Sequence, residues 1–263
     1  MRKIVSICLT AFLLYGCGSV AITGRRQILL FDSGQIASLS DAAYTEVMST
    51  AVPSRNVQQT RMVQDVGNRL VQAVTNYMKQ NGRERQLAPF SWGFTLVESN
   101  EVNAFCLPNG KVVVYEGILR FASTPDKLAV VIGHELAHVV AQHGNERMTH
   151  EVIVNMGAAV GDAVLSNSER NRAIFGAVYG VGSNFLGLLP YSRAHEYEAD
   201  RLGLIFMAMA GYDIDQAPVF WEQMSQNSGP KPPEFLSTHP SDANRQANLK
   251  ALIPEAARYA PPK

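Results

Sequence analysis

The pentapeptide His134-Glu135-Leu136-Ala137-His138 constrains the fold of this chain more than any other part of its sequence. It lies in an apolar run that follows Ser123-Thr124-Pro125-Asp126, where a cap residue, a proline and an acid favour the start of a helix. We expect this helix to end near Gly144. Because residues four apart share one face of a helix, the two imidazoles are placed to bind a single metal ion, with Glu135 beside the water that it would deprotonate.

A third ligand is expected on a different helix, because a catalytic zinc ion usually takes three protein ligands. The sequence predicts such a helix over about residues 194–210, and it contains Glu196-Tyr197-Glu198-Ala199-Asp200. Glu196 and Asp200 share one face of this helix, and Glu198 points away from that face. Glu196 is therefore the candidate third ligand, and Asp200 is the candidate acceptor for the free N–H of a histidine ligand.

The rest of the sequence predicts an α+β fold that is mostly helical, with a small antiparallel sheet beside the HEXXH helix. Aromatic and β-branched residues mark a strand over Phe90–Val97, and a strand, turn and strand follow over Val102–Tyr115. Helical spacing of apolar residues predicts a helix over Gln59–Lys79. Shorter helices are expected over about residues 40–48 and 241–252.

The N-terminus has the pattern of a processing signal that precedes a lipid anchor. Two basic residues are followed by an apolar stretch, Ile4–Tyr15, that is short for a bilayer span and closes at Cys17 in a sequence that resembles a bacterial lipobox. We therefore expect a signal peptide over residues 1–16, lipid on Cys17, and a tether with an accessory helix over residues 17–58. Gly18 favours the periplasmic face of the outer membrane over the inner membrane. The alternative is a plain secretory signal in which Cys17 is incidental.

The segment of residues 152–189 is apolar and dotted with glycine, but neither of its two apolar parts is long enough to span a membrane securely. We expect these parts to pack on the protein's own core rather than on a membrane or a partner. The sequence leaves open whether they gate the metal site.

The other potential metal ligands have ordinary interpretations. His143 comes five residues after His138 and falls off the ligand face, His150 lies in a polar stretch, and His195 points elsewhere on its helix. Cys106 is the only thiol that remains once the signal is removed and Cys17 carries lipid, so it is expected to be a small core residue without a disulfide.

Charge balance argues against nucleic acid as a partner. Basic and acidic residues both number 23, so the chain lacks the basic excess that draws proteins to phosphate backbones. A hydrophobic content of 46% and a charged content of 17% are ordinary for one packed globular domain. The oligomeric state stays open.

The two metal motifs, HEXXH at 134–138 and EXXXD at 196–200, resemble those of the M48 metallopeptidases. The family includes the CAAX prenyl endopeptidase, a heat-shock membrane protease and periplasmic lipoprotein proteases that resemble a mitochondrial member. The resemblance runs from about residue 60 to 250, and the chain is most similar to the lipoprotein branch because it lacks long hydrophobic spans. It also covers Asn103-Ala104-Phe105, the strand within Gly110–Gly117, Arg193, and Thr238-His239-Pro240 with Arg245.

This resemblance implies a zincin-like metallopeptidase domain over residues 59–255, followed by a C-terminal tail over residues 256–263. It implies one zinc ion per chain, held by His134, His138 and Glu196, with Glu135 as the general base and acid. By the same resemblance His239 donates a hydrogen bond to the oxyanion and Arg245 orders its loop. Substrate contacts are expected at Asn103, Ala104, Val113 and Arg245, with Lys111–Tyr115 as the edge strand that an extended peptide joins.

The function that these features predict is a metalloendopeptidase (EC 3.4.24) of the bacterial cell envelope, acting on polypeptides such as misfolded envelope proteins and held at the membrane by its lipid. Two alternatives stay open. One is a non-proteolytic zinc-binding lipoprotein with a chaperone-like or interaction role, and the other is an interfacial protein that uses residues 152–189. Glu135 favours the enzyme, because a structural zinc site needs no base.

Overall fold

The computed structural model describes residues 17–156, 168–179, 192–226, 233–239 and 243–262. The expected signal peptide, and residues 157–167 and 180–189 of the apolar segment, lie outside the described residues. The helices are α2 (Ser33–Thr50), α3 (Val57–Gln80), α4 (Pro125–Val140), α5 (His143–Met156), α7 (Ser168–Tyr179), α8 (Arg193–Met209), α9 (Gln216–Gln226), α10 (Glu234–Thr238) and α11 (Ala243–Ala256). The strands are β1 (Cys17–Ser19), β2 (Arg26–Ile28), β3 (Gly93–Val97), β4 (Ala104–Cys106) and β5 (Lys111–Tyr115).

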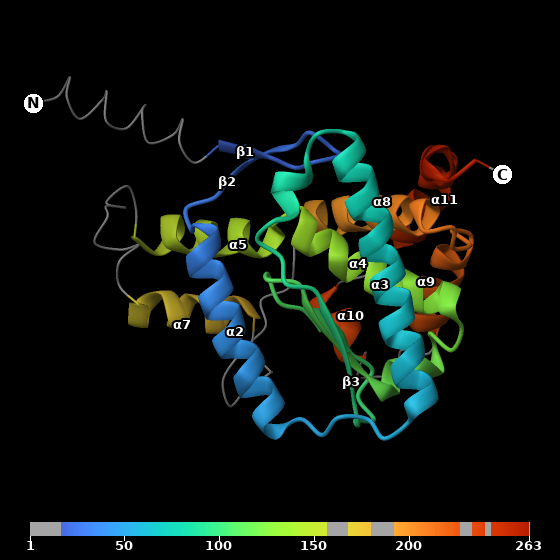
Figure 1. The fold of residues 1–263 in the computed structure, drawn as a ribbon, viewed down its shortest axis with the longest axis horizontal. Helices are drawn as coiled ribbons and strands as arrows, with labels where there is room; N and C mark the ends of the chain where they lie inside the picture. The colour runs from blue at the N-terminus through green and yellow to red at the C-terminus, as the bar shows by residue number, and fades with distance from the viewer. Residues whose placement is uncertain (1–16, 157–167, 180–191, 227–232, 240–242, 263) are drawn as a thin grey trace, which may run out of the picture.

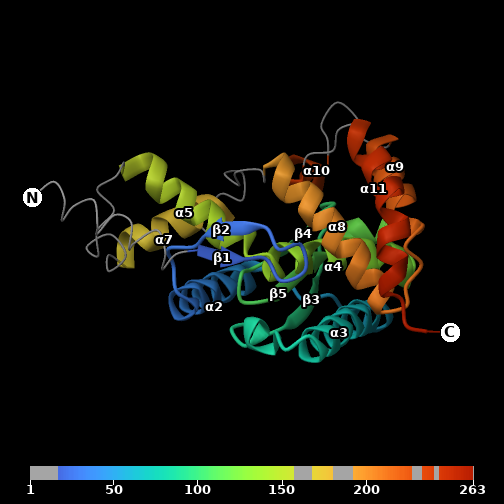
Figure 2. The same cartoon turned by 90° about the horizontal axis from the view of Figure 1, so that it is seen from above.

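Helices α4 and α8 pack against each other at the centre of the molecule and carry both metal motifs. Figures 1 and 2 show this pair in the middle, with α5 and α7 at one end of the molecule and α9 and α11 at the other. Helix α3 lies along α4, α8 and β3 and buries one apolar face, as its helical spacing predicted. The structure confirms the expected class, a mostly helical α+β fold with small sheets.

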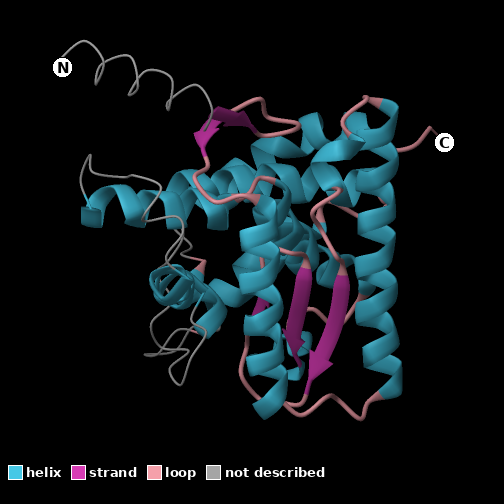
Figure 3. Ribbon diagram, turned by 60° about the vertical axis from the view of Figure 1, so that its left-hand side comes forward, coloured by secondary structure: helices cyan, strands magenta, loops and turns pink. Residues whose placement is uncertain are grey.

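The three-stranded sheet has the strand order β3-β5-β4 and lies among the surrounding helices (Figure 3). Strands β4 and β5 form the expected antiparallel hairpin, with Gly110 in its turn at a φ of 91° that favours glycine. Strand β3 pairs with β5 in parallel, so the sheet is mixed rather than wholly antiparallel. The chain reverses once after β3 and again after β4, which returns β5 to the direction of β3.

This order corrects the expected position of the edge strand. Strand β5 is central, with β3 and β4 on its two sides, and the side chain of Val113 is fully buried. Within the described residues, β4 is the edge of this sheet nearer to the metal motifs, since it contacts α4.

Helices α4 and α8 approach closely because each has a glycine at the crossing. A Cβ added to Gly203 would lie 3.2 Å from the carbonyl carbon of Gly133 and 3.3 Å from Cα of His134. The two backbones are therefore nearly in contact, with no side chain between them. This contact sets the distance between the histidines of α4 and the carboxylates of α8.

Several helix ends differ from the expected ones. Helix α2 begins at Ser33 instead of near residue 40, because Asp32 and Gln35 form a capping box. Helix α4 ends at Val140 instead of near Gly144, and α5 begins after a turn in which Gln142 has a φ of 56°. Helices α9 and α10 were not expected from the sequence.

Helices α2, α5 and α7 enclose a small second core. Its buried residues include Phe31, Leu107, Val152, Phe175 and Val178. Where it is described, the apolar segment 152–189 thus packs on the protein's own core, as expected. None of the helices in the described ranges combines the length and the hydropathy that crossing a membrane requires.

Candidate metal centre

Four side chains converge between α4, α8 and the residue after α10. They are His134, His138, Glu196 and His239, and each offers a ligand atom that lies within 4.8 Å of those of the others. All four are buried. The structure therefore brings together the three ligands predicted from the two motifs and adds His239.

The spacing of these atoms fits a shared metal ion. Tetrahedral coordination with bonds of about 2.0–2.1 Å places ligand atoms about 3.3–3.4 Å apart. The Nε2 atoms of His134 and His138 are 3.1 Å apart, and Glu196 Oε2 and Oε1 lie 3.3 and 3.4 Å from them. His239 Nδ1 lies 3.2 Å from His134 Nε2 and 3.1 Å from Glu196 Oε1.

The hydrogen bonds of Glu196 also fit a metal ion. Its Oε2 atom is buried and accepts no hydrogen bond of good geometry, although it lies 3.0 Å from Arg245 Nη1 and 3.3 Å from His134 Nε2. Burial raises the pKa of Glu196, but His239, Arg245 and His134 outweigh burial and hold that pKa well below its usual range. The carboxylate is therefore ionised, as a metal ligand requires.

Asp200 and Arg245 form a buried ion pair behind His134. Asp200 Oδ1 lies 3.1 Å from His134 Nδ1, and Arg245 donates to both carboxylate oxygens of Asp200 at 2.7 and 2.8 Å. Burial raises the pKa of Asp200, but Arg245 and His134 lower it more. Asp200 thus presents a charged acceptor to the ring nitrogen of His134 that faces away from the cluster.

Arg245 does not reach the surface on which a substrate would lie. It is 1% exposed, and its guanidinium stacks 3.6 Å from the centre of the Trp221 ring. The expectation of a substrate contact at Arg245 is therefore wrong, because its polar end is directed at Asp200, at Glu196 and at the carbonyl of His239. The bond to His239, at 3.2 Å, matches the expected role of ordering that loop.

Glu135 and His239 face each other across the cluster. His239 Nε2 lies 3.2 Å from Glu135 Oε1, while His239 Nδ1 points to Glu196. Burial lowers the pKa of His239, but Glu196 and Glu135 outweigh burial and raise it to about 9. In the absence of metal His239 is thus a cation between two carboxylates, and its Nδ1 stands at the fourth corner of the ligand set.

His143 was expected to have no role, but it lies directly behind His138. Its side chain is fully buried, with Nδ1 3.0 Å from His138 Nδ1 and Nε2 2.9 Å from Glu198 Oε2. The sequence expectation assumed one helix through residue 143, and the turn at Gln142 rotates His143 onto the side of His138. Glu198, expected only to point away from the ligand face, is the partner of His143.

The expected substrate-contact residues of the sheet are buried and belong to the start of the edge strand β4 and to the central strand β5. Asn103 precedes β4, where its Oδ1 accepts the N–H of Ala104 at 2.9 Å and its carbonyl accepts the N–H of Tyr115 at 3.1 Å. The side chains of Ala104 and Val113 are buried. A substrate contact at Val113 is ruled out by its position in the central strand, and a contact at Ala104 would involve its backbone in the edge strand β4.

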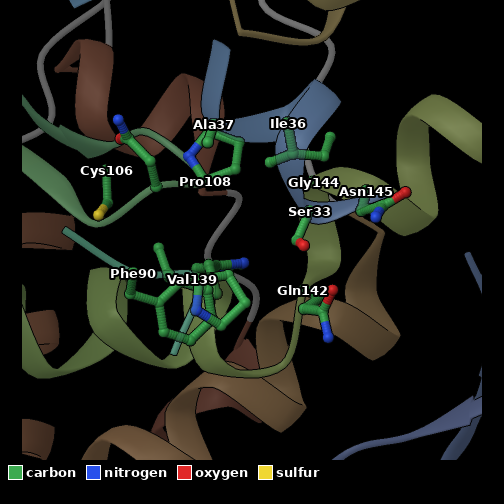
Figure 4. A pocket seen from close by; sticks show the side chains of 13 residues that line it. Ser33, Ile36, Ala37, Phe90, Cys106, Pro108, Val139, Gln142, Gly144 and Asn145 are labelled. Carbon is green, nitrogen blue, oxygen red and sulfur yellow. The ribbon is translucent and has the colours of Figure 1, made fainter. Parts of the chain in front are cut away.

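A small pocket of about 30 Å³ adjoins His138 on the side of α2 (Figure 4). Its wall combines residues of α2, the residues before β3, the β4–β5 hairpin and the α4–α5 turn, including Ile36, Phe90, Cys106, Pro108 and Gln142. Cys106 is a free, buried thiol, and burial raises its pKa. The first turns of α2, which precede the predicted accessory helix, therefore face the HEXXH helix across this pocket.

Comparison with known proteins agrees with the two motifs. The sequence profile of peptidase family M48 matches residues 58–253. The chain is 33% identical over 245 residues to the mitochondrial metalloendopeptidase OMA1 of Bos taurus, which covers 90% of this chain and 46% of that protein. It is 34% identical over 247 residues to OMA1 of Danio rerio, covering 89% of this chain and 50% of that protein.

Three bacterial relatives named as β-barrel assembly-enhancing proteases, one of them with the name marked as putative, share 25–29% identity with the chain. The β-barrel assembly-enhancing protease of Escherichia coli is 25% identical over 222 residues, covering 82% of this chain and 43% of that protein. The chain thus spans about half the length of the curated relatives it matches.

Proposed function

The chain belongs to peptidase family M48, and on that premise we propose that it is a zinc-dependent endopeptidase of the bacterial cell envelope. The observation that carries the proposal is the position of Glu135, buried beside a cluster of three expected ligands on two different helices. A structural metal site does not require a carboxylate next to its ligands, whereas a hydrolase needs a base at that position.

Zinc is the proposed ion because two imidazoles and a carboxylate are a common catalytic zinc set. When bound, zinc lowers the pKa of water and polarises the scissile carbonyl. Glu135 accepts a proton from the attacking water and passes it to the leaving amine. Asp200 holds the proton of His134 on Nδ1, so that Nε2 is free to bind the ion.

Separation of His239 from Glu135 would favour peptide hydrolysis. In the described arrangement Glu135 Oε1 lies 3.2 Å from His239 Nε2, and an imidazolium at that distance makes the carboxylate a weaker base toward water. Once the two separate, an N–H of His239 is free to donate a hydrogen bond to the oxyanion. We therefore propose that the structure is a closed form of the enzyme.

The proposed substrates are misfolded polypeptides of the envelope, bound in extended form along β4. The Escherichia coli relative is named for β-barrel assembly, which supports an envelope substrate. The lipobox-like sequence at Cys17 supports lipid attachment and a location on the periplasmic face of the outer membrane. Membrane association through the lipid and binding of polypeptide are the proposed partner interactions.

The direct test compares casein cleavage and bound zinc between the full-length protein in detergent and Glu135→Gln. We expect the variant to keep one zinc ion and to lose activity by about 10²–10⁴-fold, because only the proton acceptor is removed. Glu222→Gln, on the exposed side of α9, is the matched control and should cleave normally. Equal cleavage by parent and Glu135→Gln would overturn the proposal.

The four-donor ligand set favours one alternative, a non-proteolytic zinc-binding lipoprotein with a chaperone-like or interaction role. Structural zinc sites are closed by four protein ligands, and His239 stands at the fourth corner. The alternative predicts that the parent and His239→Ala both bind zinc without cleaving casein. A peptidase predicts cleavage by at least one of them.

A further inference from the structure

The outward-facing nitrogen of His138 meets a second histidine. His138 Nε2 faces the cluster, 3.1 Å from His134 Nε2, whereas His138 Nδ1 lies 3.0 Å from His143 Nδ1. A neutral histidine that binds a metal through Nε2 carries its proton on Nδ1. His138 must then donate this proton to His143, because Nδ1 of His143 is the atom at hydrogen-bond distance.

This assignment fixes the tautomer of His143 as well. With Nδ1 accepting, the proton of neutral His143 is on Nε2, where it meets Glu198 Oε2 at 2.9 Å. Each donor therefore faces an acceptor along the series from His138 through His143 to Glu198. His134 has a single carboxylate, Asp200, in the equivalent place.

Glu198 is held in turn by the segment between β1 and β2. Arg25 Nε lies 2.5 Å from Glu198 Oε2, and Thr23 hydrogen-bonds to the other oxygen of Glu198. The same guanidinium pairs with Glu146 of α5 at 2.7 and 2.8 Å. Glu146 also lies 3.1 Å from His195 Nε2. The network therefore joins the residues that follow Cys17 to α5, to α8 and to a metal ligand.

We propose that His143 and Glu198 are positioning residues that orient His138 for metal binding, and that Arg25 couples the N-terminal segment to the metal centre. The proposal rests on the proposed metal site, but it concerns metal affinity rather than peptide cleavage. A carboxylate that accepts a hydrogen bond from a histidine ligand fixes the orientation of the imidazole ring and makes the ring a stronger electron-pair donor to the metal. Here the imidazole of His143 lies between the carboxylate and the ligand and transmits that effect.

The test uses the full-length protein in detergent and measures zinc affinity by competition with a chelator. His143→Ala removes the acceptor of the His138 proton and should raise the zinc Kd by about 10–100-fold. His143→Asn places an amide oxygen near the former Nδ1 position and should restore most of the affinity. His143→Gln places its amide near the former Nε2 position, next to Glu198, and should restore less. His150→Ala, on the exposed part of α5, should leave the Kd unchanged.

Cobalt(II) bound in place of zinc gives an absorption spectrum that does not change when the protein is merely less stable. The visible absorption bands of bound cobalt report ligand geometry, so they should shift in His143→Ala and return toward the parent in His143→Asn. An unchanged Kd and spectrum in a folded His143→Ala protein would overturn the proposal. If that variant does not fold, equal affinities of the Asn and Gln variants would overturn it instead.

Arg25→Ala tests the coupling to the N-terminal segment, with the exposed neighbour Arg26→Ala as control. We expect a rise in zinc Kd of several-fold for Arg25→Ala and none for Arg26→Ala. Equal values for the two variants would contradict the coupling. A parent that binds zinc but cleaves no casein would contradict the proposed function alone, because all these measurements need only metal binding.

Discussion

Asp200 Oδ1 lies 3.1 Å from His134 Nδ1, and one helical turn before Asp200 the carboxylate of Glu196 meets the other nitrogen of the same ring. Two acids of α8 thus hold one imidazole of α4 from opposite sides. Because Arg245 donates to Asp200 twice, the position of this acid is fixed in turn by α11. The orientation of His134 therefore depends on three helices.

Removal of the Asp200 carboxylate should weaken both metal binding and folding. Asp200→Ala leaves Arg245 buried without its bidentate partner, which typically costs about 3–5 kcal/mol. The zinc Kd should rise by about 10–100-fold, since His134 loses its acceptor. Urea denaturation and zinc titration measure the two effects. Asp65→Ala, exposed on α3, should change neither quantity.

Metal removal should lower the melting temperature. A ligand that binds only the folded state stabilises it by about 4 kcal/mol at 1,000 times its Kd. We therefore expect Tm to fall on treatment with a chelator and to rise with added zinc, and calorimetry measures the shift. His138→Ala should show little response. A zinc-independent Tm in the parent protein would argue against a metal bound by these buried groups.

The contact between Gly133 and Gly203 should tolerate no added methyl group without movement of a helix. Gly203→Ala places Cβ 3.2 Å from the carbonyl carbon of Gly133, so α4 and α8 must separate slightly. Overpacking of this kind typically costs about 1–3 kcal/mol, and the zinc affinity should fall with it. Gly93→Ala is the comparison, because its Cβ would meet only the flexible side chain of Lys111.

Acid should weaken the network around Arg25. Partial burial raises the pKa of Glu146, but hydrogen bonds from His195 and Arg25 outweigh burial and lower it to about 2. A carboxyl with a depressed folded-state pKa stabilises the protein above its unfolded pKa, near 4.3, and this stability is lost as the pH falls toward 2. Glu146→Gln should thus be less stable at pH 7 by on the order of 1 kcal/mol.

Unfolding free energies measured from pH 7 to pH 2 check this prediction. The difference between parent and Glu146→Gln should shrink below about pH 4 as the carboxyl of the parent is protonated. Glu46→Gln, exposed on α2, is the control. A difference that stays constant over the whole range would mean that the ionisation of Glu146 does not stabilise the fold.

Helical spacing predicted those residues of the metal site that occur in pairs on one helix. His134 and His138 lie four apart on α4, and Glu196 and Asp200 lie four apart on α8, so one assumption of regular geometry placed each pair. His143 could not be placed in this way. Its position depends on the backbone turn at Gln142, a residue type that rarely adopts positive φ.

The sheet shows a similar limit. The sequence of the β4–β5 hairpin indicates its own turn, because Pro108-Asn109-Gly110 is local. The parallel pairing of β3 with β5 is not local, since the residues between β3 and β4 carry the chain across the end of the sheet. Which strand forms the edge follows from that crossing, and for this reason β5 was expected where β4 stands.

The short hairpin of β1 and β2 sets how far the metal centre can stand from a membrane. Arg25 is the eighth residue after Cys17, and even a fully extended chain over that span reaches only about 26 Å. With lipid on Cys17, as proposed, Arg25 and the two helices that it contacts, α5 and α8, would lie close to the lipid headgroups. Such an enzyme would act only within a thin layer of the periplasm. It would bind polypeptides at the bilayer surface in preference to those in free solution.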